Sequence, residues 1–392
     1  MARNRKTIYL IRHGEVDVPG RRCIGTTDVP LSERGIRQAG RLGMWMARKV
    51  IREAAPYELY TSPVSRCVYT AKRMTELTPL PERPIRVCED LHEIYMGEWE
   101  NLDFDDIRRR YPREYKERGE HMWDYKVPGA ETFEEAGQRF VGLLKELACA
   151  GNAEERETVY YVVAHGGVIR AALATIGEVV ADDVMKVKLP YGSVTRIKTE
   201  IASGEVDYTV DYIGGHPAAA PGDYRITEVL DRYEVPERIR RHMKAVADVL
   251  RRIIDVIDPA EQIYDRQILY SAAMLHDFAK LHKDLPSAGA YQLRTDGYEL
   301  VADLIAEHDT VDMHSELSVK KDGRTYVSEE DLLYYADKRV MEDQVVPLAV
   351  RFETSMAKCR TPEARMKHKL RWNKAISIEN AIYRCTGRHL EL

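Results

Sequence analysis

The sequence predicts an α/β sandwich with a mostly parallel sheet, followed by an all-α domain. Between residues 7 and 213, short β-branched or aromatic runs alternate with segments of helical periodicity. The stretch 214–224 is rich in Gly, Pro and Ala, and beyond it helical periodicity recurs with a single strand signal, at 323–327. A chain of 392 residues is also longer than one core usually organises. We therefore expect domains at 1–213 and 225–392 and a linker at 214–224.

The strands of the first domain are expected where apolar β-formers lie between turn signals. They fall at 7–11, 57–60, 85–87, 159–164, 194–201 and 206–213. Ser32 is the expected N-cap of a helix through Met46, and a second helix should begin near Ser65, after the turn at Pro63. The second domain should consist of helices at 237–257, 268–281, 298–308, 331–342 and 364–383.

The composition is that of an ordinary globular protein, with 44% hydrophobic residues, 31% charged residues and a formal net charge of -5. This charge gives no general attraction to polyanions, and the basic clusters at 108–110 and 238–241 lie in helical segments whose charged faces should be solvated. We expect no nucleic-acid partner. The six cysteines form no CxxC pair and should be free thiols.

The sequence also shows neither a secretory signal pattern nor a membrane-spanning stretch. MARNRK at the start of the chain passes directly into the strand-like TIYLI, and no apolar stretch is long enough to span a bilayer. We expect a cytoplasmic protein with no membrane partner.

Two histidines follow expected strands, where α/β sheets place their ligand chemistry. His13 lies in the triplet Arg12-His13-Gly14 after the first strand, and His165 follows the strand at 159–164. Taken alone, the triplet is equally compatible with a basic pair and a turn glycine at a strand end. The rest of the domain decides between these interpretations.

Five blocks resemble the histidine phosphatase superfamily, whose smaller members include phosphoglycerate mutases and alpha-ribazole phosphatases. They are LIRHGEV at 10–16, IGTTDVPLSERGIRQA at 24–39, YTSPVSRCVYTA at 60–71, LHEIYMGEWEN at 91–101 and VVAHGGVIRA at 162–171. The resemblance implies a phosphoglycerate mutase-like fold and a phosphomonoesterase that needs no cofactor. It also implies that His13 is the nucleophile and that Arg12, Arg66 and His165 hold the phosphoryl group.

The chemistry explains these residue types. A phosphomonoester carries up to two negative charges, so cations must neutralise its oxygens before a nucleophile can approach. The guanidinium groups of Arg12 and Arg66 offer planar donors that stay charged. His13 must attack as a neutral imidazole, and we expect a backbone carbonyl to accept from its other ring nitrogen. His165 would add a further donor.

The resemblance also maps a proton donor for the leaving group onto Glu93 and substrate contacts onto Thr26 and Glu131. Glu131, in PGAET, is the competitor of Glu93 for the acid role, and Glu98 and Glu100 are expected to be surface carboxylates. The chain departs from the family pattern at Asn101 and Ala130, where Gly is common. Gly166 and Gly167 follow His165 as in the mutase and small-phosphatase branch.

The second domain carries a histidine and carboxylate set on separate helices. His276 and Asp277 lie in AAMLHDFAK, His242 lies in an earlier helix and Asp337 in YYADK, which resembles the HD phosphohydrolase domain. The resemblance implies that these four residues bind a divalent ion, with Mn, Mg, Fe, Zn, Co and Ni all possible. The alternative is a helical core in which the histidine and aspartate only pair.

The expected number of bound metal ions depends on a position at which the chain departs from the HD-domain pattern. Relatives with two metals carry another histidine where this chain has Leu285, so we expect one ion, although His308 could join the ligands.

The leading functional hypothesis is a bifunctional phosphohydrolase acting on small phosphorylated metabolites or nucleotides. The N-terminal activity would pass through a phosphohistidine, and the C-terminal activity would depend on a metal. One alternative makes the second domain a non-catalytic nucleotide sensor. Another makes the first domain a phosphoglycerate-type mutase, which is disfavoured because the segments that retain a second phosphorylated ligand are not evident in this compact domain.

Overall fold

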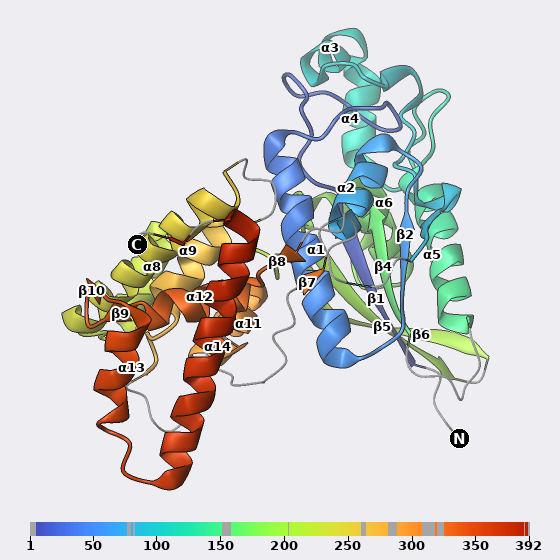
Figure 1. Cartoon of the computed structure of the whole chain (residues 1–392). Coiled ribbons are helices and arrows are strands. Elements are labelled where there is room, and N and C mark those ends of the chain that lie inside the picture. Colours follow the sequence, from blue (N-terminus) through green and yellow to red (C-terminus); the bar gives the residue numbers. More distant parts are fainter. Residues whose placement is uncertain are drawn as a thin grey trace. The chain divides into compact units, whose positions relative to one another are not determined.

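The computed structural model describes residues 5–76, 80, 83–150, 158–202, 204–259, 264–280, 288–307, 318–319, 325–387 and 389–390. The chain divides into two compact units, Met1–His216 and Pro217–Leu392 (Figure 1). Leu285 and His308 lie outside the described residues. Among the described helices, none combines the length and the apolar character that crossing a bilayer requires.

The first unit is built on a six-stranded sheet with the order β3-β2-β4-β1-β5-β6 (Figure 1). The pairs β3–β2, β2–β4 and β4–β1 are parallel, whereas β5 pairs antiparallel with both β1 and β6. The prediction of an α/β domain with a mostly parallel sheet is thus confirmed. The strands are β1 (Arg5–Arg12), β2 (Tyr57–Thr61), β3 (Ile85–Val87), β4 (Val159–Ala164), β5 (Val194–Ala202) and β6 (Glu205–Gly215).

Helices cover both faces of this sheet because successive strand residues point to opposite sides. Ile8 and Leu10 of β1 belong to a buried cluster with residues of α5 and α6. Tyr9, between them, packs its ring edge-on against Trp45 of α1 with centroids 5.1 Å apart. The helices are α1 (Glu33–Glu53), α2 (Ser65–Glu76), α3 (Phe104–Arg110), α4 (Pro112–Glu120), α5 (Phe133–Cys149) and α6 (Gly166–Thr175), with short 3₁₀ turns at Glu89–Leu91, Gly97–Trp99 and Ala181–Lys186.

The second unit is helical, as predicted, apart from two short hairpins. Its helices are α7 (Asp223–Arg232), α8 (Glu237–Ile257), α9 (Arg266–Leu275), α10 (Ala288–Thr295), α11 (Glu299–Glu307), α12 (Glu329–Lys338), α13 (Leu348–Met356) and α14 (Pro362–Thr386). One hairpin pairs β7 (Ser318–Val319) with β8 (Thr325–Tyr326), near the expected strand at 323–327. The other pairs β9 (Val340–Met341) with β10 (Gln344–Val345) and was not expected.

Several boundaries differ from the sequence prediction for local reasons. The helix expected at 331–342 ends at Lys338, because the chain turns into the β9–β10 hairpin and Glu342 takes a φ of 58° in its turn. The helix expected at 268–281 ends at Leu275, and residues 276–280 form turns. The expected linker is partly ordered, because β6 extends to Gly215 and α7 begins at Asp223.

Two glycines allow β1 and α1 to approach closely at the end of the sheet. A Cβ on Gly14, just beyond β1, would lie 2.5 Å from the carbonyl oxygen of Gly35 in the first turn of α1. A Cβ on Gly35 would in turn overlap the carbonyl oxygen of Glu15. Ser32 caps this helix by accepting from the Gly35 N–H at 3.1 Å, which confirms the predicted N-cap.

We predict that Gly35→Ala lowers the free energy of unfolding of the first unit by about 1–3 kcal/mol, because backbone must move to admit the methyl group. Gly40→Ala is the matched control on α1: its Cβ would meet nothing nearer than Arg73 Nε at 3.8 Å. That variant should gain up to about 1 kcal/mol from helix propensity. Urea unfolding, followed by tryptophan fluorescence, measures the free energy of unfolding of both variants. Equal stability of the two variants would contradict the close approach of β1 and α1.

Candidate active site

Strand register places two histidines side by side. Arg12 at the end of β1 pairs with Ala164 at the end of the parallel strand β4, so the next residue on each strand, His13 and His165, emerges at the same edge. The His13 N–H donates to the Ala164 carbonyl at 3.0 Å, and the two ring centroids are 5.1 Å apart. The sequence prediction located each histidine at a strand end, and the strand order makes them neighbours.

The His13 ring is held in one tautomer. Its Nδ1 lies 2.7 Å from the carbonyl oxygen of Gly14. A carbonyl can only accept, so Nδ1 carries the proton and Nε2 keeps its lone pair. The expected backbone partner of this imidazole is therefore present, and its Nε2 lies 3.3 Å from the Nε–H donor of Arg66.

Arg66, on α2, links both histidines to a loop. Its Nε also donates to Nδ1 of His165 at 3.1 Å, while Nη1 and Nη2 donate to the carbonyls of Thr27 and Gly25 at 2.9 and 2.6 Å. Because His165 Nδ1 accepts, its Nε2 carries the proton and donates to Ser62 Oγ at 2.7 Å. Thr26 lies in the loop that Arg66 holds, between its two carbonyl contacts.

Arg12 reaches the same site from the end of β1. Its Nη1 donates to the Leu189 carbonyl, and its guanidinium carbon lies 3.9 Å from the ring centroid of Tyr191. The buried Nε of Arg12 has no hydrogen-bond partner within the described part of the chain. An N–H held in this way is a donor suited to an anionic oxygen.

Tyr191 is a site residue that sequence reasoning missed. Besides stacking on Arg12, its ring lies 5.5 Å from that of His13, centroid to centroid. It belongs to the irregular segment before β5 and to none of the motif blocks. The only signal in the sequence is an aromatic residue between Pro190 and Gly192 at the start of a strand.

Electrostatics keep both imidazoles neutral. Burial, followed by the positive charges of Arg66 and Arg12, holds the pKa of His13 well below its ordinary value of 6.5. Burial and Arg66 have the same effect on the pKa of His165. Burial also lowers the pKa of Arg12, but Tyr191 and Glu93 act in the opposite direction. The site thus combines guanidinium charge with an unprotonated imidazole.

Glu93 is anchored at the N-terminus of α6, directly after His165. Its carboxylate accepts from the N–H groups of Gly167 and Val168, both at 2.9 Å, and from its neighbour Ile94 at 2.9 Å. A Cβ on Gly167 would lie 2.6 Å from Glu93 Oε1, which explains the glycine at this position. Glu93 therefore approaches α6 where the positive end of its dipole lies.

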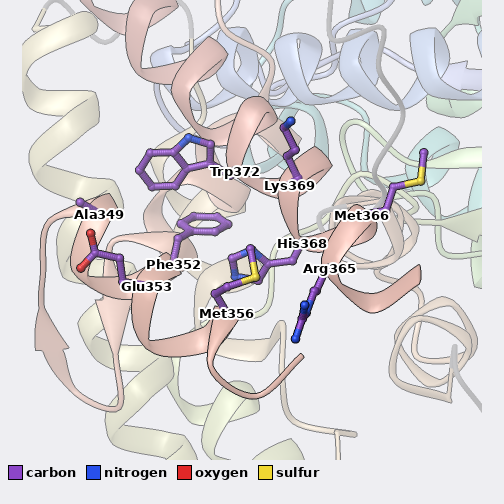
Figure 2. A pocket seen from close by; sticks show the side chains of 9 residues that line it. All are labelled: Ala349, Phe352, Glu353, Met356, Arg365, Met366, His368, Lys369 and Trp372. Carbon is purple, nitrogen blue, oxygen red and sulfur yellow. The ribbon is translucent and has the colours of Figure 1, made fainter. Parts of the chain in front are cut away.

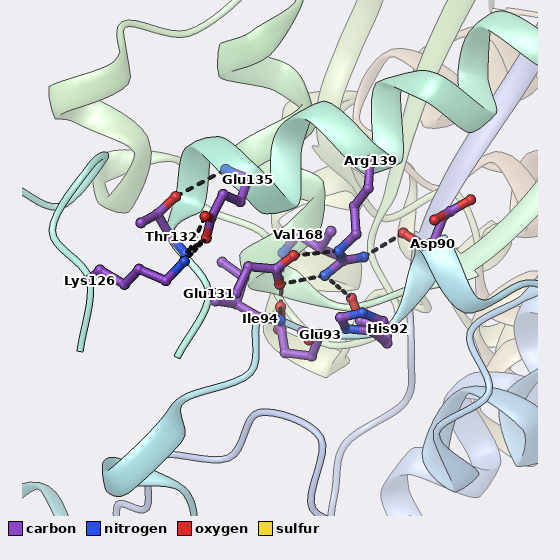
Figure 3. A network of polar contacts seen from close by, with 10 residues as sticks. All are labelled: Asp90, His92, Glu93, Ile94, Lys126, Glu131, Thr132, Glu135, Arg139 and Val168. Atoms are coloured by element: carbon purple, nitrogen blue, oxygen red, sulfur yellow. Dashed lines mark hydrogen bonds and ion pairs between the residues drawn. The ribbon is translucent and has the colours of Figure 1, made fainter. Parts of the chain in front are cut away.

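Glu131 faces a different partner. Arg139 of α5 binds its two carboxylate oxygens at 2.7 and 2.9 Å and also donates to the carbonyls of Asp90 and His92 (Figure 3). The Glu131–Arg139 pair thus braces the segment that carries Glu93. A capping box between Thr132 and Glu135 begins α5 beside it (Figure 3).

Glu100 is not the surface carboxylate that the sequence suggested. Oε1 accepts from the N–H groups of Gly25 and Thr27, both at 2.9 Å, and from the Thr27 hydroxyl at 2.6 Å. It therefore organises the loop that Arg66 grips, whereas Glu98 is exposed as expected. The interpretation failed because the partners of Oε1 are 73 to 75 positions away in the chain.

The departures from the family pattern are accommodated locally. Asn101 has a φ of 60°, in the left-handed region where asparagine is tolerated better than most residues. Its backbone N–H donates to the Cys23 carbonyl at 2.7 Å. Ala130 is buried and donates to the Val127 carbonyl at 2.8 Å, so its methyl group fits within the core.

A second cluster lies in the helical unit. One ligand atom from each of His242, His276 and Asp337 lies within 4.8 Å of the others. His242 Nδ1 donates to the Glu342 carbonyl at 2.7 Å, and His276 Nδ1 donates to the Ala273 carbonyl at 2.8 Å. Both rings are therefore oriented with Nε2 toward the cluster, where His242 Nε2 lies 3.1 Å from Asp337 Oδ1.

The fourth predicted ligand, Asp277, stands at the edge of this cluster. Its Oδ2 lies 3.9 Å from His242 Nε2 and 3.8 Å from His276 Nε2, and it is also paired with Lys280. Lys338 pairs with Asp337 at 2.6 Å. Lys338 and the two imidazoles outweigh burial and hold the pKa of Asp337 well below its ordinary range.

The first unit thus has a mostly parallel sheet whose edge presents two buried imidazoles and two guanidinium groups, donors suited to an anionic group such as a phosphoryl group. A model of the histidine phosphatase superfamily (branch 1) matches residues 8–211, about half of the chain. The chain belongs to this superfamily, which confirms the resemblance seen in the five blocks.

Individual relatives match the same part of the chain. The 6-phosphofructo-2-kinase/fructose-2,6-bisphosphatase of Gallus gallus is 29% identical to this chain over 199 residues. The aligned region covers 51% of this chain and 38% of that protein. The corresponding enzyme 3 of Rattus norvegicus is also 29% identical, with 32% of its length covered. The match therefore spans about a third of the length of these relatives.

Solved structures resemble this chain over slightly more than half of its length. A mycobacterial glucosyl-3-phosphoglycerate phosphatase in complex with inorganic phosphate is 24% identical with a TM-score of 0.44, covering 55% of this chain and 100% of that one. The alpha-ribazole phosphatase of Shigella flexneri is 22% identical with a TM-score of 0.43, covering 55% and 99%.

We predict that the imidazoles of His13 and His165 stay neutral at pH 6, because their pKa values in the folded state lie below 6.5. Below pH 6.5 the unfolded chain binds protons that the folded site does not, so these residues make stability fall as the pH falls and contribute no difference above about pH 7.5. Titration of their Cε1–H signals by NMR measures this directly. A midpoint at 6.5 or higher for His13 would contradict it.

Proposed function

We propose that the first unit is a phosphomonoesterase that passes its phosphoryl group through His13. The observation that carries this proposal is the tautomer of His13, whose Nδ1–H is held by the Gly14 carbonyl while its neutral Nε2 faces Arg66 and His165. A nucleophile of this kind, beside two guanidinium groups, suits attack on a phosphoryl group. Membership of the histidine phosphatase superfamily supports it further.

The phosphoryl group would be held by charge and by directed donors. Arg12 offers its buried Nε–H, and Arg66 offers a donor that now points at the two histidines. His165 would become a donor to a phosphoryl oxygen by turning its protonated nitrogen from Ser62 or by taking up a proton. These groups neutralise the non-bridging oxygens, which lowers the repulsion that the incoming lone pair meets.

In the first step, Nε2 of His13 forms a bond to phosphorus as the bond from phosphorus to the ester oxygen breaks. The departing alkoxide would take a proton from the protonated form of Glu93, which then becomes the carboxylate whose charge acts on Arg12. In the second step Glu93 takes a proton from water, whose oxygen attacks phosphorus, and His13 leaves as the free imidazole. Glu131 is the weaker candidate for this role because Arg139 already binds both its oxygens.

The substrate we propose is a small phosphorylated metabolite or nucleotide. The structural relatives include enzymes described as phosphatases of glucosyl-3-phosphoglycerate and alpha-ribazole phosphate, both small phosphomonoesters. A mutase of the phosphoglycerate type would use the same first step but return the phosphoryl group to an organic acceptor. Release of one inorganic phosphate per substrate consumed distinguishes hydrolysis from this alternative.

We predict that turnover of a phosphomonoester such as p-nitrophenyl phosphate traps phosphate on His13. Quenching in alkaline detergent should preserve an adduct that mild acid removes, as expected for a phosphoramidate. His13→Ala should abolish the adduct and reduce kcat by at least about a thousandfold. His121→Ala, at an exposed position in the same unit, is the control and should retain both. Retained activity in His13→Ala would exclude this nucleophile.

For the second unit we propose an HD-type site that binds one divalent ion through His242, His276 and Asp337, with Asp277 as a further ligand. The donor set fits such an ion, since two imidazoles held by backbone carbonyls and a buried carboxylate each offer a ligand atom within 4.8 Å of the other two. When bound, a divalent ion would polarise a phosphate ester and acidify a bound water. The residues of this chain would position the ion and keep its ligand oxygens ionised.

Two roles remain for this unit, and substrate turnover separates them. As a hydrolase it would make the chain bifunctional and would release phosphate or a nucleoside product in a metal-dependent manner. As a sensor it would bind nucleotide without turnover and alter the activity of the first unit. We favour the hydrolase because four protein ligands would leave a six-coordinate divalent ion free to take up water and substrate oxygens.

We predict about one tightly bound divalent ion per chain, measured by elemental analysis of the dialysed full-length protein. His276→Ala and Asp337→Ala should each lose the ion, whereas Asp343→Asn, at an ion pair with Arg241 in the same unit, should retain it. Chelation should leave the phosphatase activity of the first unit unchanged, because arginines supply its positive charge. Two tightly bound ions, or an ion retained in both alanine variants, would contradict the single-metal proposal.

A further inference from the structure

Helices α13 and α14 form a hairpin with an open apolar groove along it, about 780 Å³ in volume (Figure 2). On α13 the groove is lined by the apolar residues Ala349, Phe352 and Met356, which are spaced so that they share one face of the helix, and by one acidic residue, Glu353. On α14 it is lined by His368 and Trp372, one turn apart. Each helix thus contributes both apolar and charged side chains to the same space.

The C-terminal part of α14 is covered by other helices and provides a comparison for the exposure of the groove residues. Farther along the helix, Ala375, Ile378 and Ile382 are buried at 0 to 2% exposure, and α14 packs there against α8 and α12. On the hairpin, by contrast, Met356 is 38% and Met366 67% exposed. Among the described helices, α13 packs mainly against α14.

The floor of the groove is already formed. The Phe352 ring packs edge-on against Trp372 with centroids 5.0 Å apart and against His368 with centroids 5.2 Å apart. Ser355 Oγ lies 2.7 Å from His368 Nε2 and holds this imidazole in place. A partner would therefore meet fixed aromatic walls beside adaptable methionines, a combination found at surfaces that bind helices.

The charge of the hairpin indicates what kind of partner fits. Residues 348–374 contain eight Lys and Arg and two Glu, a formal charge of +6 in a chain whose total is -5. Arg365 and Lys369, one turn apart at the groove, have no carboxylate partner among the residues that the structure describes. Elsewhere surface cations pair within their own helix, as Arg113 does with Glu117.

We propose that this groove binds an acidic amphipathic helix of a partner protein. Its apolar residues would pack on Phe352, Met356 and Trp372, and its carboxylates would face Arg365 and Lys369. Two copies of the chain joined through this face would bring two segments of charge +6 together, which disfavours self-association. A small ligand fits less well, because an open groove encloses little of its surface.

The experiment uses the full-length chain and two fluorescent peptides of about 18 residues, each with Leu at i, i+3, i+4 and i+7 positions. One peptide carries Glu at its other charged positions and the matched peptide carries Lys. Fluorescence anisotropy should show binding of the Glu peptide and at least tenfold weaker binding of the Lys peptide. Equal affinity for both, or no binding of the Glu peptide, would overturn the proposal.

Variants locate the binding on the hairpin. Lys369→Glu should weaken the Glu peptide at least fivefold, and Met356→Gln should weaken it by removing apolar contact. Lys367→Glu is the matched control, an exposed charge on α14 that does not line the groove, and should change affinity less than twofold. Circular dichroism verifies folding of each variant. Equal effects of Lys369→Glu and Lys367→Glu, or a dimer in sedimentation that Lys369→Glu dissociates, would also overturn the proposal.

Discussion

The parallel pairing of β1 with β4 is the constraint on which the candidate active site depends. Because Arg12 and Ala164 are paired, His13 and His165 emerge together, and Arg66 from α2 can donate to both rings through one Nε–H. The same guanidinium fixes the loop at 25–27 through two carbonyls. A shift of this register would separate the imidazoles and leave a buried guanidinium without acceptors, which is costly.

Three carboxylates in the first unit stabilise the backbone segments around this site. Glu93 binds the start of α6, Glu100 binds the backbone of the loop that Arg66 grips, and Glu131 pairs with Arg139 to brace the segment that leads to Glu93. Glu93 accepts from backbone N–H groups, Glu100 from backbone N–H groups and the Thr27 hydroxyl, and Glu131 from Arg139. The histidines and arginines of the candidate site are therefore surrounded by a shell of hydrogen bonds that is present without a ligand, and such preorganisation is what the proposed catalysis would require.

The helical unit also orients its histidines through hydrogen bonds from Nδ1 to backbone carbonyls. Backbone carbonyls of Glu342 and Ala273 hold Nδ1 of His242 and His276, as the Gly14 carbonyl holds Nδ1 of His13. In each case one ring nitrogen is committed to the backbone so that the other is directed into a site. The β9–β10 hairpin, which periodicity did not predict, supplies one of these carbonyls, because Glu342 lies in its turn.

The sequence by itself determined the six strands of the first unit, the capped helix at Ser32 and the superfamily, and it singled out His13, His165 and the two arginines as candidate site residues, because local periodicity and short motifs carry that information. It also located His242, His276 and Asp337. Only the tertiary structure decided the partners of Glu100 and Glu131, the stacking of Tyr191 on Arg12 and the open face of the α13–α14 hairpin. These depend on contacts between residues far apart in the chain, which arise only once strand order and helix packing are set.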